Sequence, residues 1–375
     1  MVNKRYPVSE PSFSGKEREY LLDAFDSKWV SSKGEYIVRF EKAFSSYVGT
    51  KYGVSTSNGT TALHLAVKAL GIGKGDEVIV PDLTFAAPAN AVIYEGGTPV
   101  LVDVDKSYWG IDPKSVEEAI TDKTKAVIAV HLYGHPAKMD ELLKICKERD
   151  IRLIEDCAEA HGARFKDKIV GSMGDISCFS FYGNKIITTG EGGMALTNDE
   201  QIAESMQIFR DHGMSPEKRY WHNKVGFNYR LTNIQAAIGL AQLEYIDKKI
   251  YKRRWIANKY AEHLPDNIRM QPQMAWATHV YWISSFTIEE GSVNREKINC
   301  LMNNLYDLGI ETRPIFYPLN EMPPYFDPRT FFNAEYISNH GISLPTLDWM
   351  TESDIQNISQ SLDRELNRCM GHIKS

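Results

Sequence analysis

Between about residues 50 and 200, short runs of β-branched residues alternate with segments whose apolar positions recur at helical spacing. This alternation predicts parallel strands joined by crossover helices that cover both faces of one sheet. The predicted strands span residues 77–80, 99–102, 126–130, 152–155, 176–180 and 194–197. Two helices have recognisable starts, because Asp112 and Pro113 supply a cap and a first-turn proline, and Pro136 precedes the helix over 139–149.

The pattern changes after about residue 230, where longer helical periods replace the alternation. Amphipathic helices are predicted over 233–243, 253–264 and 295–308, an aromatic strand over 280–283, a proline-punctuated segment over 312–325, and a last helix after Thr351 with a capping-box acid at Asp354. We therefore predict a large domain over residues 1–250, which holds the ligand, and a small C-terminal α+β domain over residues 251–375.

Composition narrows the classes of partner and compartment. Lys plus Arg number 43 and Asp plus Glu 49, and no basic block is present, so nucleic acid is not expected as a partner. The five cysteines are scattered and form no CxxC pair, which predicts neither a disulfide framework nor a zinc ribbon and favours a reducing compartment. The N-terminus has no apolar signal region and no run of 18 apolar residues occurs, so we expect a cytoplasmic protein without a membrane partner.

Chemically suited residues follow two of the predicted strands, at the sheet edge where ligands of such folds bind. Lys185 follows the strand over 176–180 among aromatic residues and glycines, where desolvation lowers the pKa of an amine and favours a Schiff base. Asp156 ends the strand over 152–155, where a carboxylate suits a cationic ring nitrogen. Taken singly, a lysine such as Lys185 is better explained by a surface turn, and Asp156 is as well explained by a helix cap.

Two further segments add a phosphate site and a flat apolar surface. Gly59 and Thr60 open a helix after a turn of small residues, and the exposed amides of a helix start bind anions, although ordinary capping by Asn58 or Thr60 explains the same residues. Phe85 follows a strand and can stack on a planar ring or simply fill the core. Together the four segments predict a phosphate cradle, a ring stacker, a pyridinium partner and a Schiff-base lysine.

At this point the sequence resembles the sugar aminotransferases of the DegT/DnrJ/EryC1/StrS family, which are pyridoxal-phosphate enzymes of fold type I. The residues that carry the resemblance lie at 29–34, 57–60, 155–162, 180–193, 226–233 and 312–314. The resemblance implies an aspartate-aminotransferase-like α/β fold, with a large, mostly parallel sheet sandwiched by helices and a smaller C-terminal α+β domain. It also implies pyridoxal 5′-phosphate as the cofactor.

The family's functional residues carry over to matching positions of this chain. The resemblance implies that Lys185 and Asp156 are catalytic, with Lys185 bound to the cofactor and Asp156 facing its pyridine nitrogen. It implies cofactor contacts from Gly59, Thr60, Phe85, Glu159, Ser180 and, across the subunit boundary, Asn228. A homodimer with shared active sites follows from that last contact. Glu at position 159 is typical of the perosamine-synthase-like branch, where most of the family has Gln.

The same branch sets the expected substrates. L-glutamate is the implied donor, and GDP-4-keto-6-deoxy-D-mannose, which gives GDP-perosamine, is the first choice of acceptor. A dTDP-4-keto-6-deoxy sugar or a small phosphorylated ketone such as dihydroxyacetone phosphate is the alternative, because Asn320 stands where the branch commonly has His. Candidate substrate contacts are Trp29, Lys33, His222, Arg230, Arg313 and Asn320, and each is equally open to a packing or ion-pair role.

Other classes of protein fit the sequence less well. His131 and His135 have the spacing of a metal pair, but no Glu follows the first and the segment is a turn, so no metal is expected. A nicotinamide-dependent oxidoreductase is not expected, because this chain has no GxGxxG motif after its first predicted strand. An inactive scaffold or regulator that binds the cofactor, or a dehydratase relative with His in place of the lysine, is disfavoured because Lys185 is retained.

Overall fold

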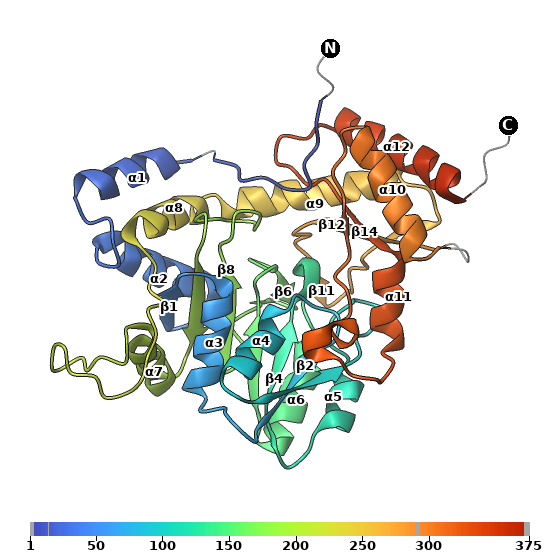
Figure 1. The fold of residues 1–375 in the computed structure, drawn as a ribbon. Coiled ribbons are helices and arrows are strands. Elements are labelled where there is room, and N and C mark those ends of the chain that lie inside the picture. Colours follow the sequence, from blue (N-terminus) through green and yellow to red (C-terminus); the bar gives the residue numbers. More distant parts are fainter. Residues whose placement is uncertain (1–3, 14, 290–292, 371–375) are drawn as a thin grey trace.

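A seven-stranded, mostly parallel sheet forms the centre of the chain in the computed structural model, which describes residues 4–13, 15–289 and 293–370 (Figure 1). In spatial order its strands are β1 (Tyr52–Thr56), β9 (Gly193–Thr197), β8 (Ile176–Ser180), β5 (Arg152–Asp156), β4 (Thr124–Val130), β2 (Glu77–Pro81) and β3 (Thr98–Val102). All six strands that were predicted between residues 77 and 197 are present. Neighbouring strands from β8 to β3 run parallel, which confirms the predicted mostly parallel sheet.

Two details of this sheet differ from the prediction. Strand β9 is antiparallel to β8, because no helix lies between them and a parallel pair needs such a crossover. Strand β1, which pairs with β9, was not predicted, because its sequence Tyr-Gly-Val-Ser-Thr shows no apolar alternation.

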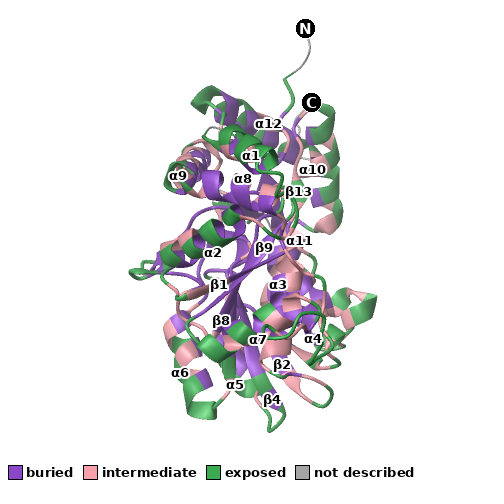
Figure 2. Ribbon diagram, turned by 90° about the vertical axis from the view of Figure 1, so that its left-hand side faces the viewer, coloured by how far each residue is buried: buried purple, intermediate pink, exposed green. Residues whose placement is uncertain are grey.

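Helices cover both faces of the sheet. Alternate strand residues pack into separate clusters: Val80, Ile128 and Ile154 belong to one face, and Ile79 and Val127 to the other. The first face is covered mainly by α2 (Glu35–Val48), α3 (Gly59–Ala69) and α4 (Ala87–Tyr94), and the second by α5 (Pro113–Ala119) and α6 (Met139–Arg149). Figure 2 shows the strands buried between helices whose outer surfaces are exposed.

The remaining helices flank this core at its edges. These are α1 (Glu17–Asp26), α7 (Glu200–Arg210), α8 (Asn233–Leu243) and α9 (Ile246–His263). Helix α1 packs on α8 and α7 packs on α3. The predicted helix over 233–243 is confirmed with those bounds, whereas the one predicted over 253–264 begins earlier, at Ile246.

The C-terminal part builds a second core on a small antiparallel sheet. Its strands, in spatial order, are β10 (Ile268–Met270), β12 (Ser284–Ile288), β14 (Gly341–Leu344) and β13 (Arg313–Pro314), and its helices are α10 (Arg295–Asp307), α11 (Phe332–His340) and α12 (Glu352–Met370). Short strands β6 (Arg164–Phe165), β7 (Lys168–Ile169) and β11 (Ala277–Thr278) form a third sheet. Asp354 accepts hydrogen bonds from the N–H and hydroxyl of Thr351, which confirms the predicted capping box of α12.

Residue 250, where we placed the domain boundary, lies within helix α9. The small sheet and helices α10 and α12 share an apolar core with Tyr260 of α9 and with Tyr6 near the N-terminus. Tyr6 also pairs with Ile310, so the beginning of the chain lies against its C-terminal part. The division at residue 250 stays a prediction.

Two other expectations need correction. The strand predicted over 280–283 is wrong: the chain bends there, and the N–H groups of Val280 and Trp282 donate to the carbonyls of Gly134 and Tyr133 instead of entering a sheet. One disulfide joins Cys300 of α10 to Cys369 of α12, although none was expected. Among the described residues, no helix is long and apolar enough to cross a membrane.

Candidate active site

Lys185 lies in the turn that follows β8, at the carboxyl edge of the sheet. Its backbone N–H donates to the carbonyl of Tyr182 at 2.9 Å, and its side chain is 11% exposed. Burial lowers the pKa of the Lys185 amine, while the nearby carboxylates of Glu159 and Asp156 partly oppose this shift. A lysine with a lowered pKa has a larger fraction of neutral amine, which is the nucleophilic form that attacks a carbonyl carbon.

Asp156 ends β5, the strand next to β8. Its register pairs it with Cys178 on one side and with Val130 on the other, so it stands among the ends of three parallel strands. The carboxylate is buried, and its Oδ1 accepts the N–H of Ala158 at 3.0 Å. Burial raises the pKa of Asp156. A buried carboxylate of this kind gains stability from a cationic partner, which a protonated ring nitrogen supplies.

Glu159 connects Lys185 to the end of β4. Its Oε1 lies 3.7 Å from the Lys185 Nζ, and its Oε2 accepts the backbone N–H of Tyr133 at 2.8 Å. Burial raises the pKa of Glu159 to about 7, against the lowering effect of Lys185. Tyr133 has a φ of 54°, an unusual backbone conformation for an aromatic residue, and it directs its N–H to Glu159.

The start of α3 forms a cradle beside the end of β8. Asn58 and Thr61 make a capping box, which leaves the first amides of the helix at Gly59 and Thr60 without intrahelical acceptors. A Cβ placed on Gly59 lies only 2.8 Å from the Cβ of Ser180. Glycine is therefore required for this close approach, and the helix amides together with the Ser180 hydroxyl suit a phosphate.

Phe85 follows β2 and leaves most of its ring uncovered, with 60% exposed. Its ring centre lies 5.9 Å from that of Phe316, a residue of the C-terminal part. An exposed aromatic face at the carboxyl edge of the sheet suits the stacking of a planar ligand ring. The phosphate cradle, the uncovered ring and the buried acid and lysine thus fit pyridoxal phosphate, as the sequence predicted.

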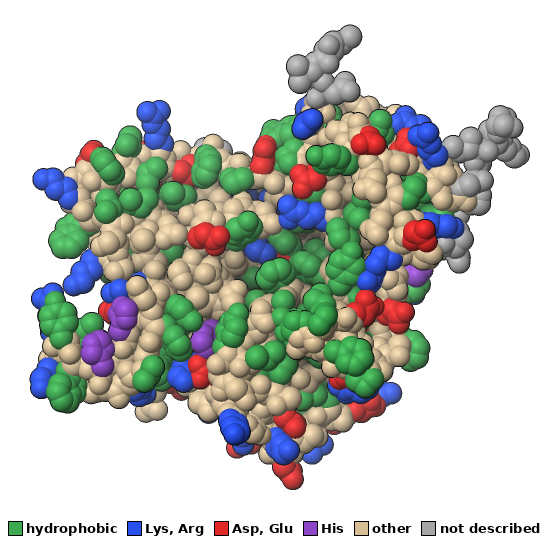
Figure 3. Space-filling view, in the orientation of Figure 1, with side chains coloured by type: hydrophobic (Ala, Val, Ile, Leu, Met, Phe, Trp, Pro, Cys, Tyr) green, Lys and Arg blue, Asp and Glu red, His purple; other side chains and the backbone are tan. Residues whose placement is uncertain are grey.

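Asn228 forms a separate, more exposed group with two of the candidate substrate residues. Its Oδ1 accepts from Nε and Nη2 of Arg230 at 3.1 and 2.9 Å, and Arg230 also lies 2.9 Å from Asp211. His212 connects His222 to the same group, because its carbonyl accepts from His222 Nδ1 and its ring Nε2 lies 3.3 Å from Arg230 Nη2. Figure 3 shows histidine and basic side chains gathered near the loop that projects beside α7. The structure therefore brings Asn228, Arg230 and His222 together.

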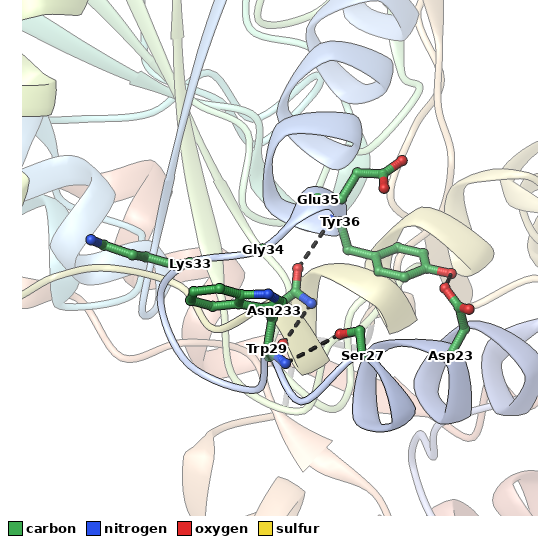
Figure 4. Close-up of a pocket in the computed structure, with 8 residues that line it drawn as sticks. All are labelled: Asp23, Ser27, Trp29, Lys33, Gly34, Glu35, Tyr36 and Asn233. Carbon is green, nitrogen blue, oxygen red and sulfur yellow. Dashed lines mark hydrogen bonds between the residues drawn. The ribbon is translucent and has the colours of Figure 1, made fainter.

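Trp29 and Lys33 line a hollow of about 380 Å³ between α1, α2 and α8. Asn233 holds its wall, because its side chain donates to the carbonyl of Trp29 and accepts the N–H of Tyr36. Figure 4 shows the Trp29 indole beside Asn233, with the Lys33 side chain extending away from Tyr36. Lys185 is not among the described residues that line this hollow. The hollow is therefore separate from the site around Lys185.

The last two candidates, Arg313 and Asn320, belong to the C-terminal part. Arg313 is close enough to Lys185 for its charge to lower the pKa of that amine. Asn320 donates its backbone N–H to Asp82, three residues before Phe85, and its side-chain amide to the carbonyl of Arg329. The side-chain amide of Asn320 therefore stabilises the loop in which it lies.

Trp282 and Tyr133 also belong to this site, and the sequence reasoning did not identify either. The centre of the Trp282 ring lies 3.7 Å from the Lys185 Nζ, and its indole N–H donates to the carbonyl of Asn184. Trp282 was instead assigned to a strand. Tyr133 lies in the turn between His131 and His135, which directly follows the predicted strand over 126–130, and this position was the available signal.

A third cluster has the composition of a metal site, namely His131, Glu155 and Cys157. His131 Nδ1 accepts the N–H of Ala137, so its Nε2 carries the proton that is donated to Glu155 at 3.1 Å. The Glu155 oxygens also accept the N–H groups of Gly171, Met173 and Gly174. Hydrogen bonds within the protein thus explain the cluster without an ion.

Comparison with known proteins identifies the family of this chain. The model of the DegT/DnrJ/EryC1/StrS aminotransferase family matches residues 11–363. Proteins named GDP-perosamine synthase are 47% identical in Caulobacter vibrioides and 45% in Escherichia coli O157:H7, and each match covers 96% of this chain and 98% of the relative. A putative sugar aminotransferase from Streptococcus pneumoniae, solved in its PLP form, superposes with a TM-score of 0.92 at 26% identity, covering 98% of this chain and all of the other. The predicted fold is confirmed, and the chain belongs to the DegT/DnrJ/EryC1/StrS aminotransferase family.

Proposed function

We propose that this chain, a pyridoxal-phosphate-dependent aminotransferase, transfers the amino group of L-glutamate to the keto carbon of a nucleotide-linked 4-keto-6-deoxy sugar. GDP-4-keto-6-deoxy-D-mannose is the first choice, with GDP-perosamine as the product. The observation that carries the proposal is the position of Lys185, whose amine lies 3.7 Å from Glu159 and near Asp156 where β5 and β8 end. The names of the relatives that are 45% and 47% identical support the choice of sugar.

Each residue of the buried site has a role in this proposal. When bound, pyridoxal phosphate supplies an electron sink that stabilises negative charge on the carbon next to the amino group. Asp156 would pair with the ring nitrogen and keep it protonated, and Phe85 would orient the ring through its exposed aromatic face. Gly59, Thr60 and Ser180 bind the phosphate through amides and a hydroxyl.

Proton transfer falls to Lys185. Once its amine is free, it lies within the site and has a lowered pKa, so it can take a proton from one carbon and return it to another. Glu159, with a pKa of about 7, faces that amine and can hold a proton at Oε1 near neutral pH. Burial of both groups limits the access of water to the transferred proton.

The exposed candidates are proposed to complete the site in a homodimer that works in the cytoplasm. Asn228 would then reach the cofactor phosphate of the partner subunit. Arg230, His222, Trp29, Lys33, Arg313 and Asn320 are proposed contacts of the nucleotide sugar. The proposal for Asn228 is supported by the exposure of its side chain, which a partner subunit can reach.

The test is to mix the purified protein with L-glutamate and follow the yellow absorbance of the lysine-bound cofactor. We expect glutamate to bleach the band and GDP-4-keto-6-deoxymannose to restore it. dTDP-4-keto-6-deoxyglucose and dihydroxyacetone phosphate serve as parallel acceptors. Recovery with either of these alone transfers the assignment to that acceptor, and a band that glutamate leaves unchanged contradicts the proposed donor reaction.

A further inference from the structure

The free amine of Lys185 lies over the face of an aromatic side chain. Its Nζ is 3.7 Å from the centre of the Trp282 ring, and the Lys185 side chain is 11% exposed. Trp282 itself is only 4% exposed. An ammonium group at this distance from an indole, and shielded from water, is attracted by the negative face of the ring.

Trp282 is fixed on several sides. Its indole N–H donates at 2.7 Å to the carbonyl of Asn184, the residue before the lysine, and its backbone N–H donates at 3.0 Å to the carbonyl of Tyr133. Its ring stacks on that of Tyr133, with centres 6.0 Å apart and planes 19° apart, and its carbonyl accepts from Arg253. The indole therefore has little freedom to move relative to the Lys185 backbone.

Tyr133, which stacks on Trp282, also contacts Glu159. It directs its strained backbone N–H to Glu159, and its ring packs between those of Trp282 and Phe316. The free amine thus contacts both the indole and a carboxylate, each 3.7 Å away, and Tyr133 contacts both of these groups. Residues 133 and 282, which are far apart in the sequence, therefore act together around the lysine.

We propose that Trp282 is a positioning residue that holds the free amine of Lys185 beside Glu159 and stabilises its protonated form. The proposal rests on the proposed role of Lys185 as the cofactor lysine. The charged and titratable groups that face this amine are Glu159, Asp156, Arg313 and His161. Among them Trp282 supplies a contact that attracts the cation without adding a formal charge.

The replacement Trp282→Phe tests this role. Phenylalanine keeps a ring that stacks on Tyr133 but lacks the indole N–H and binds cations more weakly. We expect the pKa of the free Lys185 amine to fall, with a change of about threefold to tenfold in the ratio of amine to ammonium at a given pH. The measurement is the pH dependence of reductive methylation of Lys185 in the full chain after removal of the cofactor, read by peptide mass spectrometry.

Trp276→Phe is the matched control. Trp276 also packs on aromatic side chains and carries a lysine, Lys138, at 5.0 Å from its ring centre, but its ring neighbours are Tyr108, His135 and Phe165. We expect this control to leave the methylation profile of Lys185 unchanged. If Trp282→Phe does not fold, as judged by circular dichroism, Trp282→Tyr replaces it.

A Lys185 profile that is the same in the folded Trp282 variant and in the wild type overturns the proposal. A shift of equal size in the Trp276 control overturns it as well, because the effect is then not specific to the indole near the lysine. Borohydride reduction of the loaded enzyme separates this outcome from a failure of the proposed function. It reports which lysine carries the cofactor, whether or not Trp282 changes the pKa of Lys185.

Discussion

Glu155 and Asp156 are adjacent in β5, yet the two faces of that strand give their carboxylates opposite surroundings. Glu155 accepts hydrogen bonds from His131 and from three backbone N–H groups. These contacts outweigh the effect of burial, so the pKa of Glu155 lies below its ordinary value. Burial instead raises the pKa of Asp156. Among the residues that the structure describes, its carboxylate accepts a hydrogen bond from the backbone N–H of Ala158.

This difference indicates that Glu155 stabilises the fold, whereas Asp156 is available to bind a ligand. The Glu155 carboxylate accepts from four donors of this chain, so it needs no ligand, and it holds the turn at residues 171–174 in place. On the Asp156 face the buried carboxylate lies near a lysine and has too few partners to stabilise its charge. A site that lacks partners of its own is one that a cationic ligand completes.

Asp156→Asn is the change with the largest expected effect on activity. The amide has the same shape but cannot keep a ring nitrogen protonated, so we expect the rate of amino transfer to fall by about 10²–10³-fold, the size seen when one preorganised electrostatic group is removed. Unfolding by urea should show stability equal to or above that of the wild type. Turnover within a few-fold of wild type would contradict the assignment of Asp156.

Glu155→Gln applies the same chemical change to the neighbouring residue. The new amide NH₂ faces backbone N–H groups that need an acceptor, so we expect a loss of about 1–3 kcal/mol in the free energy of unfolding. The remaining folded enzyme should transfer amino groups at a rate close to wild type. The two substitutions together test the comparison, because a loss of activity without a loss of stability in Glu155→Gln would break it.

Gly59→Ala tests the phosphate cradle with a smaller effect. The added Cβ meets the Ser180 Cβ at 2.8 Å, so the start of α3 must shift. We expect cofactor affinity to fall about tenfold, which corresponds to about 1.4 kcal/mol. Equilibrium dialysis against pyridoxal phosphate measures the change. Gly73→Ala is the matched control, because Gly73, like Gly59, has no positive φ, and its added Cβ makes only an ordinary contact, 3.6 Å from the carbonyl oxygen of Glu95.

The pH dependence of stability, which concerns the free energy of unfolding and not activity, tests the titration of Glu159. The folded-state pKa of Glu159, about 7, lies above its ordinary value of 4.5, so its stabilising contribution is complete below pH 4.5 and is lost as the pH rises through 7. Glu159→Gln removes this loss. Urea unfolding of the cofactor-free proteins should therefore show the variant gaining on the wild type by about 3 kcal/mol between pH 4.5 and 8. A constant difference across that range would exclude the proposed titration.

The sequence was sufficient to find residues placed by strand ends. Lys185 and Asp156 follow buried apolar runs, and a parallel sheet brings such positions to one edge whatever the details of packing. Gly59 was found from another local signal, a turn of small residues before an amphipathic helix. These predictions depended on local pattern and on one rule of topology.

Contacts between distant segments were beyond the reach of that reasoning. Trp282 reaches Lys185 because the chain bends at residues 282–283 instead of continuing as a strand, and no local pattern of an aromatic run distinguishes the two. The positive φ of Tyr133 is equally hidden, since glycine or asparagine is the usual signal of that conformation. The pairing of Cys300 with Cys369 depends on how α10 and α12 pack.

The most direct test of the account is to identify the lysine that carries the cofactor. The protein is purified with pyridoxal phosphate, reduced with borohydride so that the bond between amine and cofactor becomes permanent, digested, and analysed by peptide mass spectrometry. The account predicts one modified peptide, containing Lys185, and no cofactor-modified peptide in Lys185→Ala. A reduced cofactor on another lysine, or bleaching of the yellow band by glutamate in Lys185→Ala, would contradict it.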